Sequence, residues 1–492
     1  MDIAGIDPPN IFTMTNVLVI IIGSLVGLII GALPGLGAAI AIVLLLPFTY
    51  TMEPLASILL LLSAYQSAEY GGSISAIVLG IPGTPAAVTT VLDGHPMAKN
   101  ESPGKALGYS LIACLIGGIA GGLVLLFLTV PLSQFALNLS NPEFFLIGVI
   151  GLLAVAGLSS NDLIKSLIFT VLGLLAGTVG IDMFTSLPRF TFGRPELMEG
   201  LSLIAVLIGM YAFSEIFKMI NEDLHKQYIA DVKKLKIKLP FRELKNVFSF
   251  SGIGSIYGAI IGIFPGLGTG ISSWLAYSTA RKVSKSPETF GKGNPEGIMT
   301  AESANNSTVG GALIPLLTLG IPGSPTIAII MGAFVIHGIQ PGPNVFSEEP
   351  KLINGILIGF LLTSIVMFII GLLVTRMFVK VLMTPTQFLI PALLILTLVG
   401  VYSSNGMFFE LWFAFFTGVI CFFMRELDFS FPAFILAFVL SPIIEESLRR
   451  TLIISDGSYF IFFERLYSVA ILSIGALFIF LFFFLKIRKL TN

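Results

Sequence analysis

Two nearly identical heptapeptides contain the residues whose types and spacing could bind a charged solute. "LGIPGTP" spans 79–85 and "LGIPGSP" spans 319–325, so they differ only at Thr84 and Ser324. Proline removes a backbone donor and glycine costs order, so each heptapeptide interrupts a helix. A helix that restarts after a break offers free N–H groups and about half a positive charge. The breaks therefore predict an anion site made of backbone amides and two hydroxyls.

A second pair of motifs shares the same chemistry. "GALPGLG" at 31–37 matches "GIFPGLG" at 262–268, and its Pro and Gly residues would shape turns that face the heptapeptides. The alternative is that these residues only allow tight helix packing or kinks, which are common in membrane helices. The candidate substrate-binding residues are Pro34, Gly35, Gly37, Gly80, Pro82, Gly83, Thr84, Pro265, Gly266, Gly268, Gly320, Pro322, Gly323 and Ser324.

Polar runs precede both heptapeptides, "SAEYGGS" at 67–73 and "SANNST" at 303–308. Their hydroxyl, amide and carbonyl oxygens suit Na⁺, whereas a carboxylate at Glu69 or Glu302 could couple a proton, because an ionisable group inside a membrane is a functional candidate. The alternative is that the polar groups only join helices, with Glu302 at the membrane interface. The candidate cation-coupling residues are Ser67, Glu69, Ser73, Glu302, Asn305, Asn306, Ser307 and Thr308.

The elements that position these residues are membrane helices. The chain has 492 residues, of which 55% are hydrophobic and only 11% charged, with a mean hydropathy of +0.96. Continuous apolar stretches at 16–33, 111–130 and 466–485 each have the length of one bilayer. Barrel strands would instead alternate apolar and polar positions. The sequence predicts an all-α polytopic membrane protein with about 11–12 membrane segments.

Basic residues indicate the orientation. The segment 218–245 contains eight Lys or Arg against four acidic residues, and "KIRK" at 486–489 lies in the C-terminal tail, so both are expected on the cytoplasmic side. The acidic start favours an outside N-terminus, and no cleavable signal is expected. Cys114 and Cys421 fall in apolar segments, so neither a disulfide nor a structural metal site is expected. No cofactor or nucleic-acid partner is expected.

The matched motifs indicate an internal duplication. The "PGLG" motifs, the heptapeptides and the "SSN" tripeptides at 159–161 and 403–405 follow in the same order in both halves. If the first half starts outside and the second inside, the halves are inverted-topology repeats with broken or re-entrant helices. We expect repeat 1 at 1–220, a charged cytoplasmic linker at 221–246, repeat 2 at 247–462 and an extra transmembrane helix at 463–492.

The order of these motifs carries a resemblance. "GALPGLG", "SAEYGGSISAIVLGIPGTPAAV" and "DGHPMAK", followed by "FPGLG", "ESANNSTVGGALIPLLTLGIPGSP" and "HGIQPGP", resemble the large membrane subunit (TctA family) of tripartite tricarboxylate transporters. The resemblance covers nearly the whole chain. It implies a permease of the prokaryotic inner membrane that works with a small membrane subunit and an extracytoplasmic solute-binding protein. It also implies import of small di- or tricarboxylates such as citrate, driven by a sodium or proton gradient.

Other classes of function are alternatives to a binding-protein-dependent transporter. The chain has no "GxxxxGK[ST]" phosphate loop, "HExxH" motif or "GxSxG" elbow, so neither ATP-driven transport nor an enzyme is indicated. A stand-alone carrier or a channel for another organic anion is the alternative, since channels also use irregular backbone for selectivity. Asp182, Arg189 and Arg194 could face a partner subunit, and the sequence leaves open whether the complex is a homodimer.

Overall fold

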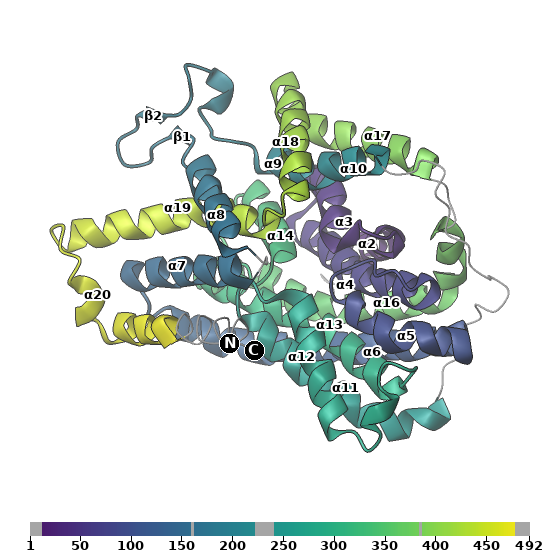
Figure 1. The fold of residues 1–492 in the computed structure, drawn as a ribbon. Coiled ribbons are helices and arrows are strands. Elements are labelled where there is room, and N and C mark those ends of the chain that lie inside the picture. The colour runs from purple at the N-terminus through teal and green to yellow at the C-terminus, as the bar shows by residue number, and fades with distance from the viewer. Residues whose placement is uncertain (1–11, 159–161, 222–240, 383–385, 478–492) are drawn as a thin grey trace.

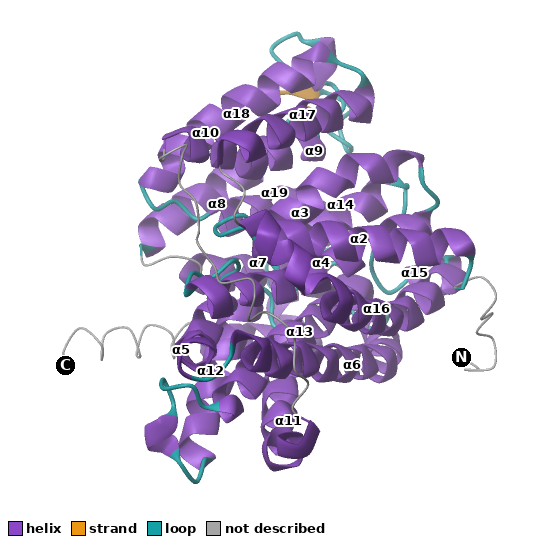
Figure 2. Cartoon of the chain, turned by 90° about the vertical axis from the view of Figure 1, so that its right-hand side faces the viewer, coloured by secondary structure: helices purple, strands orange, loops and turns teal. Residues whose placement is uncertain are grey.

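The computed structural model describes residues 12–158, 162–221, 241–382 and 386–477, and this part of the chain is almost entirely helical (Figures 1 and 2). Its one sheet pairs β1 (Gly180–Ile181) with β2 (Pro188–Arg189) in antiparallel register, with Gly180 opposite Arg189. The predicted all-α fold is confirmed.

The elements of the first half begin with a helix broken by the first "PGLG" motif. In chain order they are α2 (Met14–Ala32), α3 (Gly37–Leu45), η2 (Leu46–Thr51), α4 (Pro54–Leu79), α5 (Ala87–Asn100), α6 (Pro103–Ala136), α7 (Asn141–Leu158), α8 (Leu163–Gly177), η3 (Pro195–Leu197), α9 (Leu203–Leu207), the π-helical turn η4 (Ile208–Phe213) and α10 (Ser214–Asn221).

The second half begins in the same way. Its elements are α11 (Phe241–Ile263), α12 (Gly268–Val283), η6 (Pro287–Thr289), α13 (Pro295–Leu319), α14 (Pro325–Ile336), α15 (Val345–Glu348), α16 (Pro350–Leu382), α17 (Thr386–Asn405), α18 (Phe408–Glu426), α19 (Phe431–Ile454) and α20 (Ile461–Glu464).

Six helical stretches of the described chain are long and apolar enough to cross a membrane, so the protein is polytopic. They are Met14–Ala32, Pro103–Ala136, Leu203–Asn221, Pro350–Thr375, Phe408–Glu426 and Phe431–Ile454. The helices α4 and α13, with 26 and 25 residues, are not among these spans. They carry the two polar runs and are almost completely buried by their neighbours. Polar helices at membrane depth must be covered by protein in this way.

All four Pro and Gly motifs interrupt helices, as predicted. The chain leaves helical geometry between α2 and α3, α4 and α5, α11 and α12, and α13 and α14. The backbone angles of the two halves match closely: φ is +88° at Gly35 and +87° at Gly266, and it is +71° at both Gly80 and Gly320. Only glycine adopts such angles without strain, so the glycines fix where each helix ends.

Matched glycine stripes hold the broken helices against α4 and α13. On α2, a Cβ atom at Gly27 would lie 2.2 Å from the backbone oxygen of Ala64 in α4. On α11, a Cβ at Gly258 would lie 2.3 Å from the backbone oxygen of Ala304 in α13. Small residues let helix backbones approach this closely in membrane proteins. The two halves thus repeat one packing unit.

The remaining helices surround this centre. Helix α4 is packed against α2 and α16, and α13 is packed against α6 and α11. Helices α7 and α8 lie against α19, on the left of Figure 1. The domain limits and the inverted orientation of the halves stay predictions. Residues 222–240 of the linker, residues 478–492 of the expected last helix, the first "SSN" and the start of the chain lie outside the described residues. The second "SSN" ends α17.

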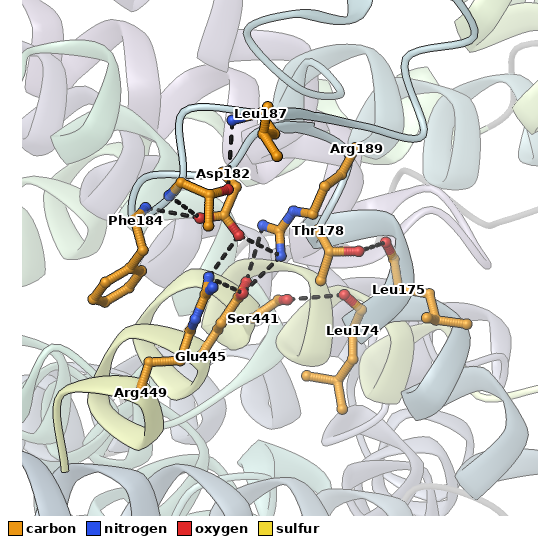
Figure 3. A network of polar contacts seen from close by, with 11 residues as sticks. Leu174, Leu175, Thr178, Asp182, Phe184, Leu187, Arg189, Ser441, Glu445 and Arg449 are labelled. Carbon is orange, nitrogen blue, oxygen red and sulfur yellow. Dashed lines mark hydrogen bonds and ion pairs between the residues drawn. The ribbon is translucent and has the colours of Figure 1, made fainter. Parts of the chain in front are cut away.

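A polar network ties the segment around β1 and β2 to α19 (Figure 3). Arg189 donates two hydrogen bonds to Glu445, of 2.6 and 3.1 Å, and Arg449 donates one of 2.6 Å to Asp182. The Arg449 guanidinium, together with two backbone N–H groups, holds the pKa of Asp182 well below its ordinary value. Asp182 and Arg189, two of the residues that could face a partner subunit, thus bind residues of their own chain.

Candidate functional site

All four helix breaks meet at one cavity. It has a volume of about 910 Å³, and its wall includes the first turns of α3, α5, α12 and α14. These helices have 9, 14, 16 and 12 residues, and each presents its N-terminal end to the cavity. Helix N-termini carry unpaired N–H groups and partial positive charge. Four of them around one volume form a site suited to an anion.

Backbone hydrogen bonds fix the two heptapeptides in the same position in each half. The Gly83 N–H donates to the Gly72 carbonyl in α4, and the Gly323 N–H donates to the Ala312 carbonyl in α13, each at 3.2 Å. The Gly323 carbonyl also accepts from the N–H of Gly266 at 3.1 Å, which joins the second heptapeptide to the second "PGLG" turn. The breaks are therefore anchored turns, and the cavity wall is preorganised.

The structure brings part of the candidate substrate-binding set to the cavity. The members that line it are Gly35, Gly37, Pro82, Gly83, Thr84, Gly266, Gly268 and Ser324. The members that shape the turns without lining it are Pro34, Gly80, Pro265, Gly320, Pro322 and Gly323. Gly320 instead lines a smaller cavity of about 340 Å³ beside Pro341.

The two candidate carboxylates occupy different surroundings. Glu69 lines the cavity and is 3% exposed, and its Oε2 atom has no hydrogen-bond partner. Glu302 is completely buried in α13. Its Oε1 accepts from Ser73 at 2.6 Å and from Thr90, and its Oε2 accepts from Cys114 at 3.1 Å. Glu302 thus joins α4, α5 and α6 to α13.

Some of the other cation candidates have hydrogen-bond partners, and others have none. Ser307 donates to the Ser255 carbonyl at 2.8 Å, and Thr308 donates to the Ala304 carbonyl at 2.7 Å. Ser67, Asn305 and Asn306 are buried, and the hydroxyl of Ser67 and both amide ends of each Asn have no hydrogen-bond partner. Buried polar groups are normally paired. This group therefore points to a ligand, water or ion.

Sequence reasoning missed side chains that line the cavity from other elements. Lys165 in α8 and Arg425 in α18 both contribute to its wall. The Lys165 ammonium donates to the Leu427 carbonyl at 2.9 Å, and Arg425 donates to Glu215. Tyr65 and Tyr211 also line the cavity. Lys165 was detectable as a rare basic residue between apolar stretches, but no motif connects Arg425 to the helix breaks.

Comparison with known proteins identifies the family. The model of the tripartite tricarboxylate transporter TctA family matches residues 17–436, a range that includes all four helix breaks. The chain belongs to the TctA family. TctA proteins are the large membrane subunits of three-part transporters, which confirms the resemblance of the motifs and implies a small membrane subunit and a binding protein as partners.

Two relatives from Agrobacterium vitis match the chain over different lengths. An "uncharacterized 52.8 kDa protein in TAR-I ttuC' 3'region" is 35% identical over 463 residues, covering 94% of this chain and 92% of that protein. An "uncharacterized protein in TAR-II ttuC' 3'region" is 36% identical over 218 residues, covering 44% of this chain and 90% of that protein. No solved structure matches this TctA chain.

Proposed function

We propose that this TctA protein is the permease subunit of a binding-protein-dependent secondary transporter that imports small di- or tricarboxylates, such as citrate. The observation that supports this most strongly is the convergence of four helix N-termini on one cavity. In secondary transporters, the N-terminal ends of broken helices commonly hold anionic substrate groups near the bilayer midplane. A solute with two or three carboxylates can engage several of the four ends at once.

The basic side chains of the cavity complement this anion site. Lys165 lines the cavity beside Asp162, with 3.8 Å between the ammonium and the carboxylate, so it keeps donor capacity for a solute. Arg425 is paired with Glu215, which also contacts Lys218 at 3.3 Å. These groups attract an anion without placing an isolated charge in the cavity wall. Backbone amides therefore supply most of the binding, and Lys165, whose ammonium donates to the Leu427 carbonyl and faces Asp162, adds positive charge to the wall.

The proposed transport cycle uses a cation gradient across the cytoplasmic membrane, with the N-terminus outside and the C-terminus in the cytoplasm. The binding protein delivers the carboxylate from outside, and the cation enters with it. Glu69 is the reason a cation is needed, because a bare carboxylate in the cavity wall repels an anionic solute. A bound sodium ion or proton removes that repulsion.

Uptake of labelled citrate and of a panel of small carboxylates tests the proposal. Cells that express this chain with its two partners are measured in Na⁺-containing and Na⁺-free buffer at several pH values. Saturable uptake that requires the binding protein and a cation gradient is expected. Uptake that persists without the binding protein would indicate a stand-alone carrier, and flux without saturation would indicate a channel. No uptake of any carboxylate by the assembled complex would contradict the substrate class.

A cavity variant connects uptake to the site. A Cβ at Gly270, which lines the cavity in α12, would lie in ordinary contact with Pro85 at 3.4 Å. Gly270→Leu therefore fits the helix but extends toward the first heptapeptide, and uptake should fall. Gly252→Leu is the matched control, because nothing lies within 4 Å of its Cβ position on exposed α11 surface. Equal uptake by both variants would separate transport from this cavity.

A further inference from the structure

Three buried polar side chains from both halves meet beside the cavity. They are Glu69 of α4, Thr84 of the first heptapeptide and Asn305 of α13, with exposed fractions of 3%, 3% and 1%. Thr84 and Asn305 lie beside the Glu69 carboxylate. Thr84 can lie this close to α4 because Gly72 has no side chain: a Cβ at Gly72 would lie 2.8 Å from the Thr84 hydroxyl.

Several polar atoms of this cluster make no hydrogen bond of ordinary distance and angle, although Thr84 and Asn305 lie within interaction range of the Glu69 carboxylate. Glu69 Oε2, Thr84 Oγ1 and both amide atoms of Asn305 make no hydrogen bond in the described part of the chain. Leaving one buried polar atom unpaired costs about 1–3 kcal/mol, so three neighbouring residues with unpaired atoms form a costly arrangement. A structural role does not explain it, because Glu302 in the same region has donors for both of its oxygens.

The charge of the cluster points to a cation. Glu69 makes no ion pair with a basic side chain of the described residues, and the charged group that acts on it is Glu302, another carboxylate. The basic residues of the cavity wall are engaged elsewhere, Arg425 by Glu215 and Lys165 by the Leu427 carbonyl. Inside a membrane, a carboxylate without a counter-charge marks an ion or proton pathway.

We propose that a sodium ion binds between Glu69 Oε2, Thr84 Oγ1 and Asn305 Oδ1, and that its binding prepares the cavity for the carboxylate substrate. This inference rests on the proposed function and names its coupling ion. A proton would satisfy only Glu69 Oε2, whereas a hard cation engages the carboxylate, hydroxyl and amide oxygens together. The ion also neutralises Glu69, so the anionic solute enters a cavity that no longer repels it. Sodium binding therefore precedes substrate binding.

The second half has no equivalent cation site. In the matched alignment of the heptapeptides, Val309 stands where Glu69 is, Ser324 where Thr84 is, and Tyr65 where Asn305 is. These residues are satisfied within the protein, since the Ser324 hydroxyl accepts from Ile327 N–H at 3.2 Å and lies 3.4 Å from the Tyr65 hydroxyl. The chain therefore holds one sodium ion at the helix breaks and not a symmetric pair.

Thermal unfolding of the purified full chain, without substrate or partners, tests the site directly. NaCl replaces choline chloride at constant ionic strength, with KCl as a second comparison. Because a ligand of the folded state stabilises it by mass action, the melting temperature should rise saturably with Na⁺ alone. Glu69→Gln should abolish the rise, and Thr84→Val, which keeps the side-chain size, should raise the half-saturating Na⁺ concentration by about tenfold or more.

Glu302→Gln is the matched control, since it alters a buried carboxylate whose oxygens already have protein donors. It should lower the melting temperature in choline and still show a saturable Na⁺-specific rise, because the three proposed Na⁺ ligands stay in place. If Glu69→Gln does not fold, Thr84→Val decides. The absence of a Na⁺-specific shift in the wild type, a shift that depends on pH and not on Na⁺, or equal shifts in Thr84→Val and the wild type would overturn the site. A Na⁺ shift with no carboxylate uptake would instead contradict the substrate class alone.

Discussion

The two heptapeptide breaks share a backbone and differ in their side chains. Gly83 and Gly323 donate to the carbonyls of Gly72 and Ala312 over the same 3.2 Å, and φ is +71° at both Gly80 and Gly320. Yet Thr84 lies beside Glu69 with an unpaired hydroxyl, while the Ser324 hydroxyl caps α14. The shared backbone supplies two matched pairs of helix N-termini for an anion, and the difference confines the cation to one side.

The comparison also shows that the helix breaks and the cation site depend on different residues. Glycine and proline positions determine the breaks in both halves. Only the first half places a carboxylate on its polar helix at the level of the break, because Val309 occupies the corresponding position in α13. A duplicated fold can therefore bind substrate with both halves and couple a cation with one.

The largest effects should be equal in the two breaks. Gly83→Val and Gly323→Val should each abolish carboxylate uptake, because a Cβ at Gly83 would lie 2.2 Å from the Gly31 backbone oxygen and one at Gly323 2.7 Å from the Ala312 backbone. Uptake is measured per amount of protein inserted in the membrane, with Gly252→Val as the control that meets nothing within 4 Å. Normal uptake in both variants would remove the breaks from the transport site.

The next effect should distinguish the breaks. Glu69→Gln should eliminate the Na⁺ dependence of uptake, whereas Val309→Ala, at the matched position of the other half, should keep it. The reason is that only Glu69 carries a charge that the cation must balance. Initial uptake rates against Na⁺ concentration give the comparison. A sodium response that survives in Glu69→Gln, or disappears in Val309→Ala, would contradict the one-sided coupling.

The hydroxyls of the two breaks should differ more modestly. Ser324→Ala removes the side-chain cap of α14, which should lower the free energy of unfolding by about 1 kcal/mol without changing the half-saturating Na⁺ concentration. Thr84→Val should raise the half-saturating Na⁺ concentration and leave the free energy of unfolding in choline unchanged, since the Thr84 hydroxyl caps no helix. Thermal unfolding in choline chloride and in NaCl measures both quantities on each variant. Identical profiles for the two variants would mean that the breaks are equivalent.

The smallest difference between the two halves should come from the "PGLG" turns. Gly37 has φ of +68° and Gly268 of +66°, and the nearest atom to a Cβ at either position is at least 3.7 Å away or absent within 4 Å. Alanine therefore meets only backbone strain, which costs about 1–2 kcal/mol per residue. Gly37→Ala and Gly268→Ala should lower the melting temperature by similar small amounts. A loss several times larger at one of them would show that the two turns differ.

The sequence was sufficient for the breaks because they are local. Gly35 and Pro82 interrupt a helix through their own backbone chemistry, so the motifs could be located without knowing what they pack against. The family resemblance then followed from the order of these motifs.

The surroundings of each side chain depended on contacts between distant segments. Glu302 receives hydrogen bonds from Ser73, Thr90 and Cys114, which lie on three other helices, so its difference from Glu69 was not readable in the sequence. Arg425 reaches the cavity from α18 for the same reason. Periodicity and motif order place helices along the chain but do not determine which side chains share a cavity.

Protection of a cysteine in the cavity tests the central claim most directly. Val88, in the first turn of α5, lines the cavity and is 51% exposed, whereas the native Cys114 and Cys421 are 0% and 5% exposed. In Val88→Cys, a charged thiol reagent should label the new cysteine, and citrate or another transported carboxylate should slow the labelling saturably and only with Na⁺. Leu187→Cys, 64% exposed and outside the cavity, should be labelled without protection. Val88→Cys labelling that no small carboxylate slows would contradict a carboxylate site at the four helix N-termini.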